Sequence, residues 1–222
     1  MLLETIEQAT GEAPQASIII LHGLGADGND FVPICDQLDL SAVGPVRFVF
    51  PHAPVRPVTI NGGYPMRAWY DVLSFDRAGT EDEAGLRESI SQVVALIERE
   101  EERGVESSRI VVMGFSQGCA MTLLAGLRHD RPLAGLVALS GYLPLASTLA
   151  AERSPANAEV PVFLAHGTAD SVVPLARGEA ARTALEELGY PVEWHTYPLS
   201  HSVSAQEIAD INRFLLRVLA PA

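Results

Sequence analysis

Short runs of apolar residues recur along the chain, and turn-forming residues follow each run. The runs cover residues 17–21, 46–50, 110–113, 136–139, 162–165 and 192–197. Most of them are apolar at successive positions rather than at alternate ones, which is typical of strands buried on both faces of a parallel sheet. Gly, Pro, Ser or His then follows, as expected where a strand meets a loop. These segments are therefore predicted to be the strands of one sheet.

Stretches with helical periodicity lie between the predicted strands. Two apolar stripes have helical spacing, one made of Leu86, Ile90, Val93, Val94 and Ile97 and the other of Ile208, Ile211, Leu215 and Leu219. Each stripe follows a hydroxyl residue with a Glu three positions later, Thr80 with Glu83 and Ser204 with Glu207, which is the pattern of a capping box at a helix start. Further helices are predicted over residues 119–125 and from Pro174 to about residue 188.

This alternation of strands and helices predicts an α/β fold in a single domain that spans residues 1–222. The central sheet should be mostly parallel, with helices on both faces. Residues 51–79 and 141–160 interrupt the alternation, and the second stretch has room for only a short helix. Neither is large enough for a lid domain. Ligands of such sheets bind at the carboxyl ends of the strands, so functional residues are expected there.

Charge and composition narrow the range of partners. The chain has a net charge of -13, which disfavours binding to nucleic acids because their phosphates are also negative. No apolar run approaches the roughly 18 residues needed to span a bilayer, and the first residues lack the features of a signal peptide. We therefore expect a cytoplasmic protein without stable membrane insertion. Cys35 and Cys119 are expected to be free thiols, because two scattered cysteines seldom form a disulfide in a chain with an ample core.

The pentapeptide Gly-Phe-Ser-Gln-Gly at residues 114–118 joins a predicted strand to a predicted helix. A sharp turn in this position lifts the hydroxyl of its central serine above the edge of the sheet. The flanking glycines leave room where the strand and the helix pass close together, and the start of the helix favours negative charge nearby. Ser116 is therefore the candidate nucleophile, and the alternative is a serine in an ordinary loop.

A serine hydroxyl attacks efficiently only when a histidine accepts its proton and a carboxylate orients that histidine. On this kind of sheet the acid and then the base follow the serine along the chain. Asp170 comes just after the strand at 162–165 and is the candidate acid, with a role in a turn as its alternative. Asp130 is a weaker candidate because it follows a helix.

His201 lies in the loop after the last predicted strand, from which it can reach Ser116, and is the candidate base. His195 is its rival, but it lies inside a strand and would be held on a sheet face. The remaining histidines are expected to have structural or solvent-exposed roles; they are His22, His52, His129 and His166.

Acyl transfer also requires two N–H groups that bind the negative oxygen formed during the reaction. Gln117, the residue after the nucleophile, is expected to supply one of them. The glycine-rich segment 22–28 follows an early strand and should supply the other, from Leu24 or Gly25. This segment lacks both the Lys-Ser/Thr pair of a P-loop and the spacing of a dinucleotide-binding loop, so a phosphate-binding role is excluded.

Together these motifs resemble those of the phospholipase/carboxylesterase family, the group of α/β hydrolases that contains carboxylesterases and acyl-protein thioesterases. The resemblance rests on segments 21–25, 51–54, 68–71 and 114–118, on His166-Gly167 with Asp170, and on His201, which together span nearly the whole chain. Residues 55–67 most resemble bacterial carboxylesterases. The chain departs from the family at Cys119, where members often have Gly, and this change should affect helix packing rather than the reaction.

The resemblance implies an α/β-hydrolase fold without a large lid domain and a triad of Ser116, Asp170 and His201. It also implies an oxyanion hole formed by the N–H groups of Leu24 and Gln117. In the family the segment leading to Trp69 borders the acyl pocket, so Trp69 and Leu73 are candidate pocket residues, with a core aromatic as the alternative for Trp69.

We therefore expect a serine carboxylesterase that hydrolyses short-to-medium-chain carboxylic esters through an acyl-enzyme, with a small-molecule ester or thioester as its partner. The alternatives are an acyl-protein thioesterase, a lysophospholipase, and a non-catalytic binding protein on the same scaffold. No cofactor and no metal are expected. The sequence does not fix the oligomeric state, although relatives are often homodimers.

Overall fold

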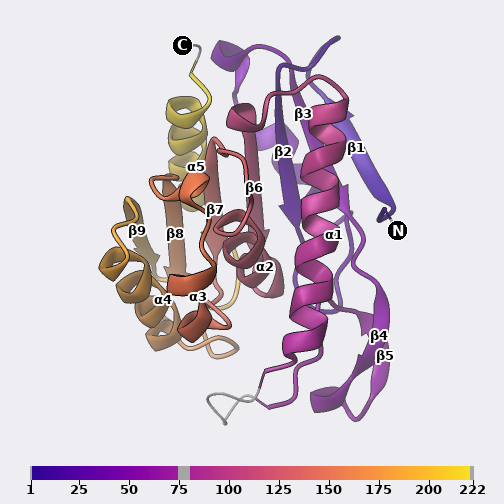
Figure 1. Cartoon of the computed structure of the whole chain (residues 1–222), viewed down its shortest axis with the longest axis vertical. Coiled ribbons are helices and arrows are strands. Elements are labelled where there is room, and N and C mark those ends of the chain that lie inside the picture. The colour runs from indigo at the N-terminus through magenta and orange to yellow at the C-terminus, as the bar shows by residue number, and fades with distance from the viewer. Residues whose placement is uncertain (1, 75–80, 221–222) are drawn as a thin grey trace.

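A seven-stranded sheet forms the centre of the computed structural model, which describes residues 2–74 and 81–220 (Figure 1). The strands lie in the order β1-β3-β2-β6-β7-β8-β9, and all neighbours are parallel except β1, which pairs antiparallel with β3. Their bounds are Thr5–Ala9 (β1), Ala16–Leu21 (β2), Val46–Pro51 (β3), Ile110–Phe115 (β6), Gly135–Leu139 (β7), Val162–Gly167 (β8) and Val192–Tyr197 (β9). Each of the predicted strands is present, so the expectation of a mostly parallel central sheet is confirmed.

Three strands of the structure were not predicted from the sequence. One is β1, at the edge of the main sheet, whose residues are half-buried or exposed. The other two are β4 (Val55–Val58) and β5 (Tyr64–Arg67), which pair antiparallel as a separate hairpin within the irregular stretch 51–79. Edge and hairpin strands bury little side-chain surface, so they lack the continuous apolar run that marks an inner strand.

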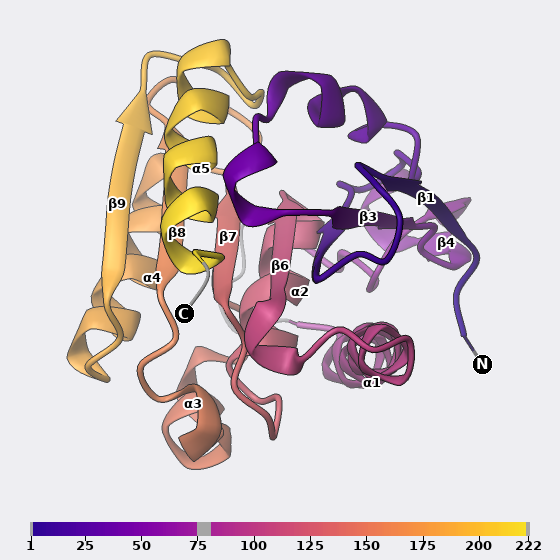
Figure 2. The same ribbon diagram turned by 90° about the horizontal axis from the view of Figure 1, so that it is seen from above.

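Helices cover both faces of the sheet, as in an α/β-hydrolase fold. They are α1 (Glu83–Glu102), α2 (Gln117–Gly126), α3 (Ala146–Glu152), α4 (Leu175–Glu187) and α5 (Ala205–Val218). Figure 2 shows α5 on one side of the sheet and α1, α2 and α3 on the other. The helices predicted over 119–125 and from Pro174 to about 188 correspond to α2 and α4, and the short helix expected in 141–160 is α3.

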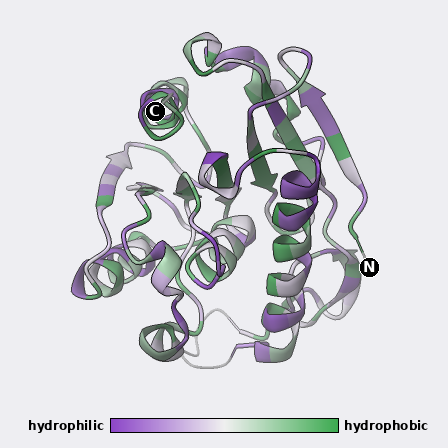
Figure 3. Cartoon of the chain, turned by 45° about the horizontal axis from the view of Figure 1, so that its top comes forward, coloured by the Kyte–Doolittle hydropathy of each residue, from purple (hydrophilic) through white to green (hydrophobic). Residues whose placement is uncertain are grey.

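Two hydrophobic cores lie on the two faces of the sheet, because successive side chains of a strand point to opposite sides. In β2, Ile19 and Leu21 belong to the core that includes α1, α2 and α4, whereas Ile18 and Ile20 belong to the core under α5. In Figure 3 the inner strands are coloured as hydrophobic and α1 carries both colours, in agreement with burial of one helix face.

The two predicted capping boxes had different outcomes. At α5, Ser204 Oγ accepts a hydrogen bond of 3.2 Å from the N–H of Glu207, as predicted. At α1, the N-cap is Asp82, whose carboxylate accepts a hydrogen bond of 3.0 Å from the N–H of Gly85. Thr80, the predicted cap, lies outside the described residues. An aspartate oxygen satisfies a free N–H of the first turn as well as a hydroxyl does, which explains why Asp82 can serve as the cap.

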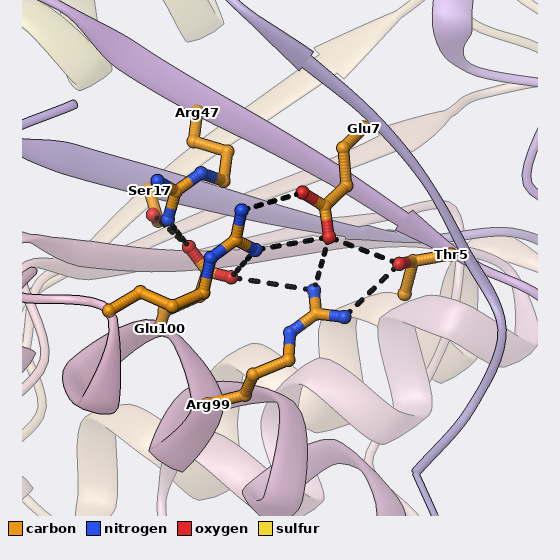
Figure 4. A network of polar contacts seen from close by, with 7 residues as sticks. Thr5, Glu7, Ser17, Arg47, Arg99 and Glu100 are labelled. Atoms are coloured by element: carbon orange, nitrogen blue, oxygen red, sulfur yellow. Dashed lines mark hydrogen bonds and ion pairs between the residues drawn. The ribbon is translucent and has the colours of Figure 1, made fainter. Parts of the chain in front are cut away.

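A buried ion cluster fastens the edge strand β1 to the end of α1 (Figure 4). Its centre is Glu100, which is fully buried and receives hydrogen bonds from Ser17 (2.7 Å), Arg47 (2.6 Å) and Arg103 (2.9 Å). Arg99 and Arg103 also pair with Glu7 on β1, at 2.9 Å each. The cluster therefore connects β1, β2 and β3 to one helix end.

Within the described ranges, no helix is both long and apolar enough to cross a membrane. Cys35 and Cys119 are free, as expected. The cytoplasmic location and the single-domain organisation stay predictions, and the oligomeric state stays open.

Candidate active site

Ser116 lies in the turn between β6 and α2, with backbone angles φ 57° and ψ −115°. A positive φ is strained for a residue with a side chain, and such strain is typical of functional positions. The flanking glycines are required by close approach: a Cβ on Gly118 would lie 2.0 Å from the carbonyl oxygen of Leu21, and one on Gly114 would lie 2.2 Å from that of Gly118. The predicted reason for both glycines is confirmed, and the turn holds the Ser116 side chain at the carboxyl end of β6.

The structure brings Ser116, His201 and Asp170 together from three separate loops. His201 Nε2 lies 2.9 Å from Ser116 Oγ, and His201 Nδ1 lies 2.7 Å from Asp170 Oδ2. When Nδ1 carries the proton and donates a hydrogen bond to the carboxylate, Nε2 is free to accept the hydrogen bond of the serine hydroxyl. This is the relative arrangement in which a histidine can remove the serine proton during attack.

Asp170 is held as a carboxylate inside the protein. Its side chain is fully buried, and Oδ1 accepts hydrogen bonds from the N–H groups of Val172 (2.9 Å) and Val173 (2.8 Å). Burial by itself raises the pKa of Asp170, but the hydrogen bonds from His201 and from the two N–H groups outweigh it and lower the pKa below the usual value. The carboxylate therefore stays ionised and can stabilise a protonated His201.

The rival residues lie elsewhere. His195 remains in β9, where its Nε2 contacts Glu193 Oε1 at 2.9 Å and its ring stacks on Phe163 with centroids 4.8 Å apart. Asp130 is exposed, and its nearest histidine is His129, at 4.0 Å. Neither rival contacts Ser116, so the geometry favours His201 and Asp170.

Two further histidines hold the segment after β2. His22 Nε2 accepts a hydrogen bond of 3.0 Å from the N–H of Ala53, and His52 Nδ1 accepts one of 3.0 Å from the N–H of Gly28. Burial lowers the pKa of His22, which keeps its ring neutral and able to accept. Both histidines therefore have structural roles, because their hydrogen bonds hold the glycine-rich segment 22–28 in place.

Two backbone N–H groups near Ser116 are candidates for the oxyanion hole. Gly25 N–H donates a hydrogen bond of 2.9 Å to the carbonyl of Arg67, which leaves Leu24 rather than Gly25 as the candidate of this segment. The N–H groups of Leu24 and Gln117 have no acceptor among the described residues. Gln117 is the first residue of α2, where backbone N–H groups have no partner within the helix.

The prediction that Trp69 lines the pocket is wrong. Trp69 is fully buried in the core, and its indole N–H donates a hydrogen bond of 2.9 Å to the carbonyl of His22. The side chain of Gln117 receives a hydrogen bond of 3.0 Å from the N–H of Trp69 and donates one of 2.9 Å to the carbonyl of Tyr70. Trp69 therefore connects His22, at the start of the glycine-rich segment, to Gln117 through hydrogen bonds. No sequence pattern indicated this connection.

A cavity of about 580 Å³ opens above Ser116 and His201. Its apolar wall consists of Leu24, Val72, Leu73, Phe115, Val172 and Val173, so the prediction for Leu73 agrees with the geometry. Two residues that the sequence did not single out, Tyr142 and Arg177, also line it. In the described part of the chain, no cluster of three His, Cys, Asp or Glu side chains could hold a metal ion.

Comparisons with known proteins agree with this fold. The model of the phospholipase/carboxylesterase family matches residues 4–219. Acyl-protein thioesterase 1 of Mycosarcoma maydis is 41% identical, with 96% of this chain and 95% of that protein covered. Its namesake in Yarrowia lipolytica is 38% identical, with 91% and 92% covered. The crystal structure of Zea mays acyl-protein thioesterase 2 is 30% identical, covers 97% of this chain and 99% of its own, and has a TM-score of 0.84. The chain therefore belongs to the phospholipase/carboxylesterase family, whose members are hydrolases of ester and thioester bonds.

Proposed function

We propose that this chain hydrolyses acyl thioesters and carboxylic esters with Ser116 as nucleophile, His201 as general base and Asp170 as the residue that orients the base. The observation that carries the proposal is the pair of contacts from His201, 2.9 Å to Ser116 and 2.7 Å to Asp170, at the floor of the cavity. The comparisons support the hydrolase class, whereas the assignment of individual residues rests on this geometry.

In the proposed reaction, Ser116 Oγ attacks the acyl carbon while His201 Nε2 takes the hydroxyl proton. The oxygen of the tetrahedral intermediate becomes negative and receives hydrogen bonds from the N–H groups of Leu24 and Gln117. Collapse of the intermediate releases the thiol or alcohol, which takes the proton back from His201. A water molecule then attacks the acyl-enzyme by the same route and regenerates Ser116.

We place acyl thioesters ahead of simple esters as the preferred substrate. The named relatives that cover almost the whole chain are acyl-protein thioesterases, at 35–41% identity. This reverses the order expected from the sequence, which put simple esters first. The apolar wall of the cavity fits an acyl chain, and the relatives do not fix the length of that chain.

Two measurements test the proposal. A fluorophosphonate probe should label Ser116 in the intact protein and fail to label Ser116→Ala, whose kcat should fall by roughly 10⁴–10⁶. His201→Ala should lose a similar factor, whereas the matched variant His195→Ala should retain activity. Absence of labelling in the intact protein would support the non-catalytic alternative, and activity that survives in His201→Ala would refute the assignment of the base.

The substrate order is tested separately. We expect a higher kcat/KM for an S-acyl cysteine peptide than for the O-acyl serine peptide of the same sequence and acyl chain. A preference for the O-acyl peptide, or for lysophospholipids over both peptides, would contradict the thioester assignment and leave the triad assignment intact.

A further inference from the structure

Arg177 differs from the other arginines in the described part of the chain. All 15 basic residues are arginines, against 28 acidic residues. Every other described arginine donates to a carboxylate or to a backbone carbonyl. Arg177 has no carboxylate oxygen of a described residue within 4.0 Å, although it lines the catalytic cavity. An arginine without an anionic partner is unexpected in so acidic a protein.

The guanidinium of Arg177 is held in place by aromatic residues. It lies over the ring of Tyr142, 3.6 Å from the centroid, and the Tyr142 hydroxyl forms a hydrogen bond of 2.9 Å with that of Tyr70. Stacking uses the flat face of a guanidinium and leaves N–H groups on its edge available to bind a planar anion. Burial raises the pKa of Tyr142, so its phenol stays neutral and does not supply the missing negative charge.

This stack stands next to the nucleophile. Gly141, the residue before Tyr142, packs so closely on the turn that a Cβ there would lie 2.8 Å from the carbonyl oxygen of Ser116. Arg177 and Ser116 line the same cavity. A substrate bound at Ser116 would therefore share this cavity with the guanidinium.

The position of Arg177 on its helix adds to the positive potential. Arg177 is the third residue of α4, which has no acidic residue in its first turn and no side-chain cap. The N-terminal end of a helix carries partial positive charge, so a cation there is unfavourable unless an anion is close. Neither the first turn of α4 nor a side-chain cap supplies such an anion.

Four carboxylates of the described residues line the cavity, and three of them are engaged with backbone N–H groups. Asp71 accepts from Thr59, Asp82 accepts from Asp71 and Gly85, and Glu81 accepts from Leu145. Neither these three nor the fourth, Asp30, has an oxygen within 4.0 Å of the Arg177 guanidinium, so none of them is paired with it.

We propose that Arg177 is a specificity residue that binds an anionic group of the substrate, a carboxylate or a phosphate, close to the bond that is cleaved. The inference rests on the proposed function, because it requires that the cavity hold the acyl substrate. It assigns to the site a class of substrates, acyl compounds with a negative group on either the acyl part or the leaving group.

Three matched pairs of substrates test which part of the substrate must carry the negative group that Arg177 binds. A carboxylate on the acyl part is tested by mono-4-nitrophenyl adipate against 4-nitrophenyl hexanoate. For the leaving group, a carboxylate is tested by the butyryl thioester of 3-mercaptopropionate against that of 2-mercaptoethanol. A phosphate is tested by butyryl-coenzyme A against butyryl-N-acetylcysteamine. The measured quantity is the ratio of kcat/KM between the charged and the neutral member of each pair.

We expect a preference for the charged member of at least one pair, and a fall of that ratio by roughly 10-fold or more in Arg177→Gln, since charge-assisted hydrogen bonds are strong in a partly buried site. Arg177→Glu should reverse the preference, and added salt should reduce it in the unmodified protein. The control is Arg182→Gln on the same helix, whose arginine pairs with Glu186 at 2.7 Å and should not affect the ratio.

Two results would overturn the inference. The first is that the unmodified protein hydrolyses the neutral esters but prefers no charged member. The second is that Arg177→Gln lowers kcat/KM for both members equally, which would make Arg177 a support for Tyr142. If the protein hydrolyses no substrate and the fluorophosphonate does not label Ser116, the proposed function itself fails.

Discussion

Replacement of Glu100 by glutamine should destabilise the fold without a direct effect on the catalytic contacts. The carboxylate of Glu100 is fully buried among three arginines, and the nearest, Arg47, has a side chain only 11% exposed. The amide of Glu100→Gln keeps the volume and one acceptor oxygen but removes the negative charge. Arg47 on β3 then remains mostly buried without a counter-ion, whereas Arg99 and Arg103 keep their pairs with Glu7.

The size of the effect follows from the burial of the pair. Removal of one partner from a buried ion pair typically costs about 3–5 kcal/mol, because the remaining charge stays desolvated. Glutamine can still accept one hydrogen bond, so we expect the lower end, about 3 kcal/mol. For a protein of this size that loss corresponds to a fall in Tm of about 6–12 °C.

Urea and thermal unfolding followed by far-UV circular dichroism measure the loss. Glu186→Gln is the matched control, because it breaks the exposed pair with Arg182, whose contribution should be about 0.5 kcal/mol or less. A free energy of unfolding for Glu100→Gln within about 1 kcal/mol of the control would refute the reasoning. Fluorophosphonate labelling at low temperature should proceed at the normal rate, because Glu100 contacts Ser17 and Arg47 at the amino ends of β2 and β3, whereas Ser116 follows the carboxyl end of β6.

Two further variants test charges near the site. Asp170→Asn should lower kcat by about 10⁴ at pH 8, because the amide can hold His201 in the wrong tautomer; a loss below tenfold in a steady-state ester assay would contradict the role of Asp170. Its pKa is lowered in the fold, so the stability that Asp170 contributes is present at neutral pH and is lost as the pH falls through the folded-state pKa. Burial raises the pKa of Glu207 to about 7, although a hydrogen bond with the backbone of Ser204 acts in the opposite direction and lowers it. The folded state then binds a proton that the unfolded chain releases at lower pH, so stability should fall as the pH rises from about 4.5 to about 7. Glu207→Gln should remove this slope and unfold at higher urea concentration than the unmodified protein at pH 8, and a steeper slope or a lower midpoint would contradict the argument.

The inner strands and most of the candidate site could be predicted because they depend on local sequence. Each inner strand is apolar along its length, and the turn around Ser116 requires glycines at fixed positions. The order of Asp170 and His201 along the chain then selected the remaining members of the triad.

The features that could not be predicted depend on contacts between distant segments. The residues alone left Leu24 and Gly25 open and only the family resemblance pointed to Leu24; the hydrogen bond from Gly25 to Arg67 agrees with Leu24. The role of Trp69 is decided by its bond to the carbonyl of His22. Arg177 lies on a helix whose sequence gives no hint that its first turn borders the cavity. In each case the sequence specifies the residue type, whereas the fold specifies the neighbour.

The close packing at Gly118 links the reactivity of the protein to its folding. The turn around Ser116 can close only when the backbone near Leu21 is already in place against it, since a Cβ at Gly118 would lie 2.0 Å from that carbonyl oxygen. His201, the proposed base, lies 85 residues after Ser116 in the chain. A nascent or misfolded chain therefore contains an ordinary serine hydroxyl in place of the proposed nucleophile. Labelling of Ser116 by a fluorophosphonate would then report how much of a preparation has reached the native topology, independently of its secondary structure content.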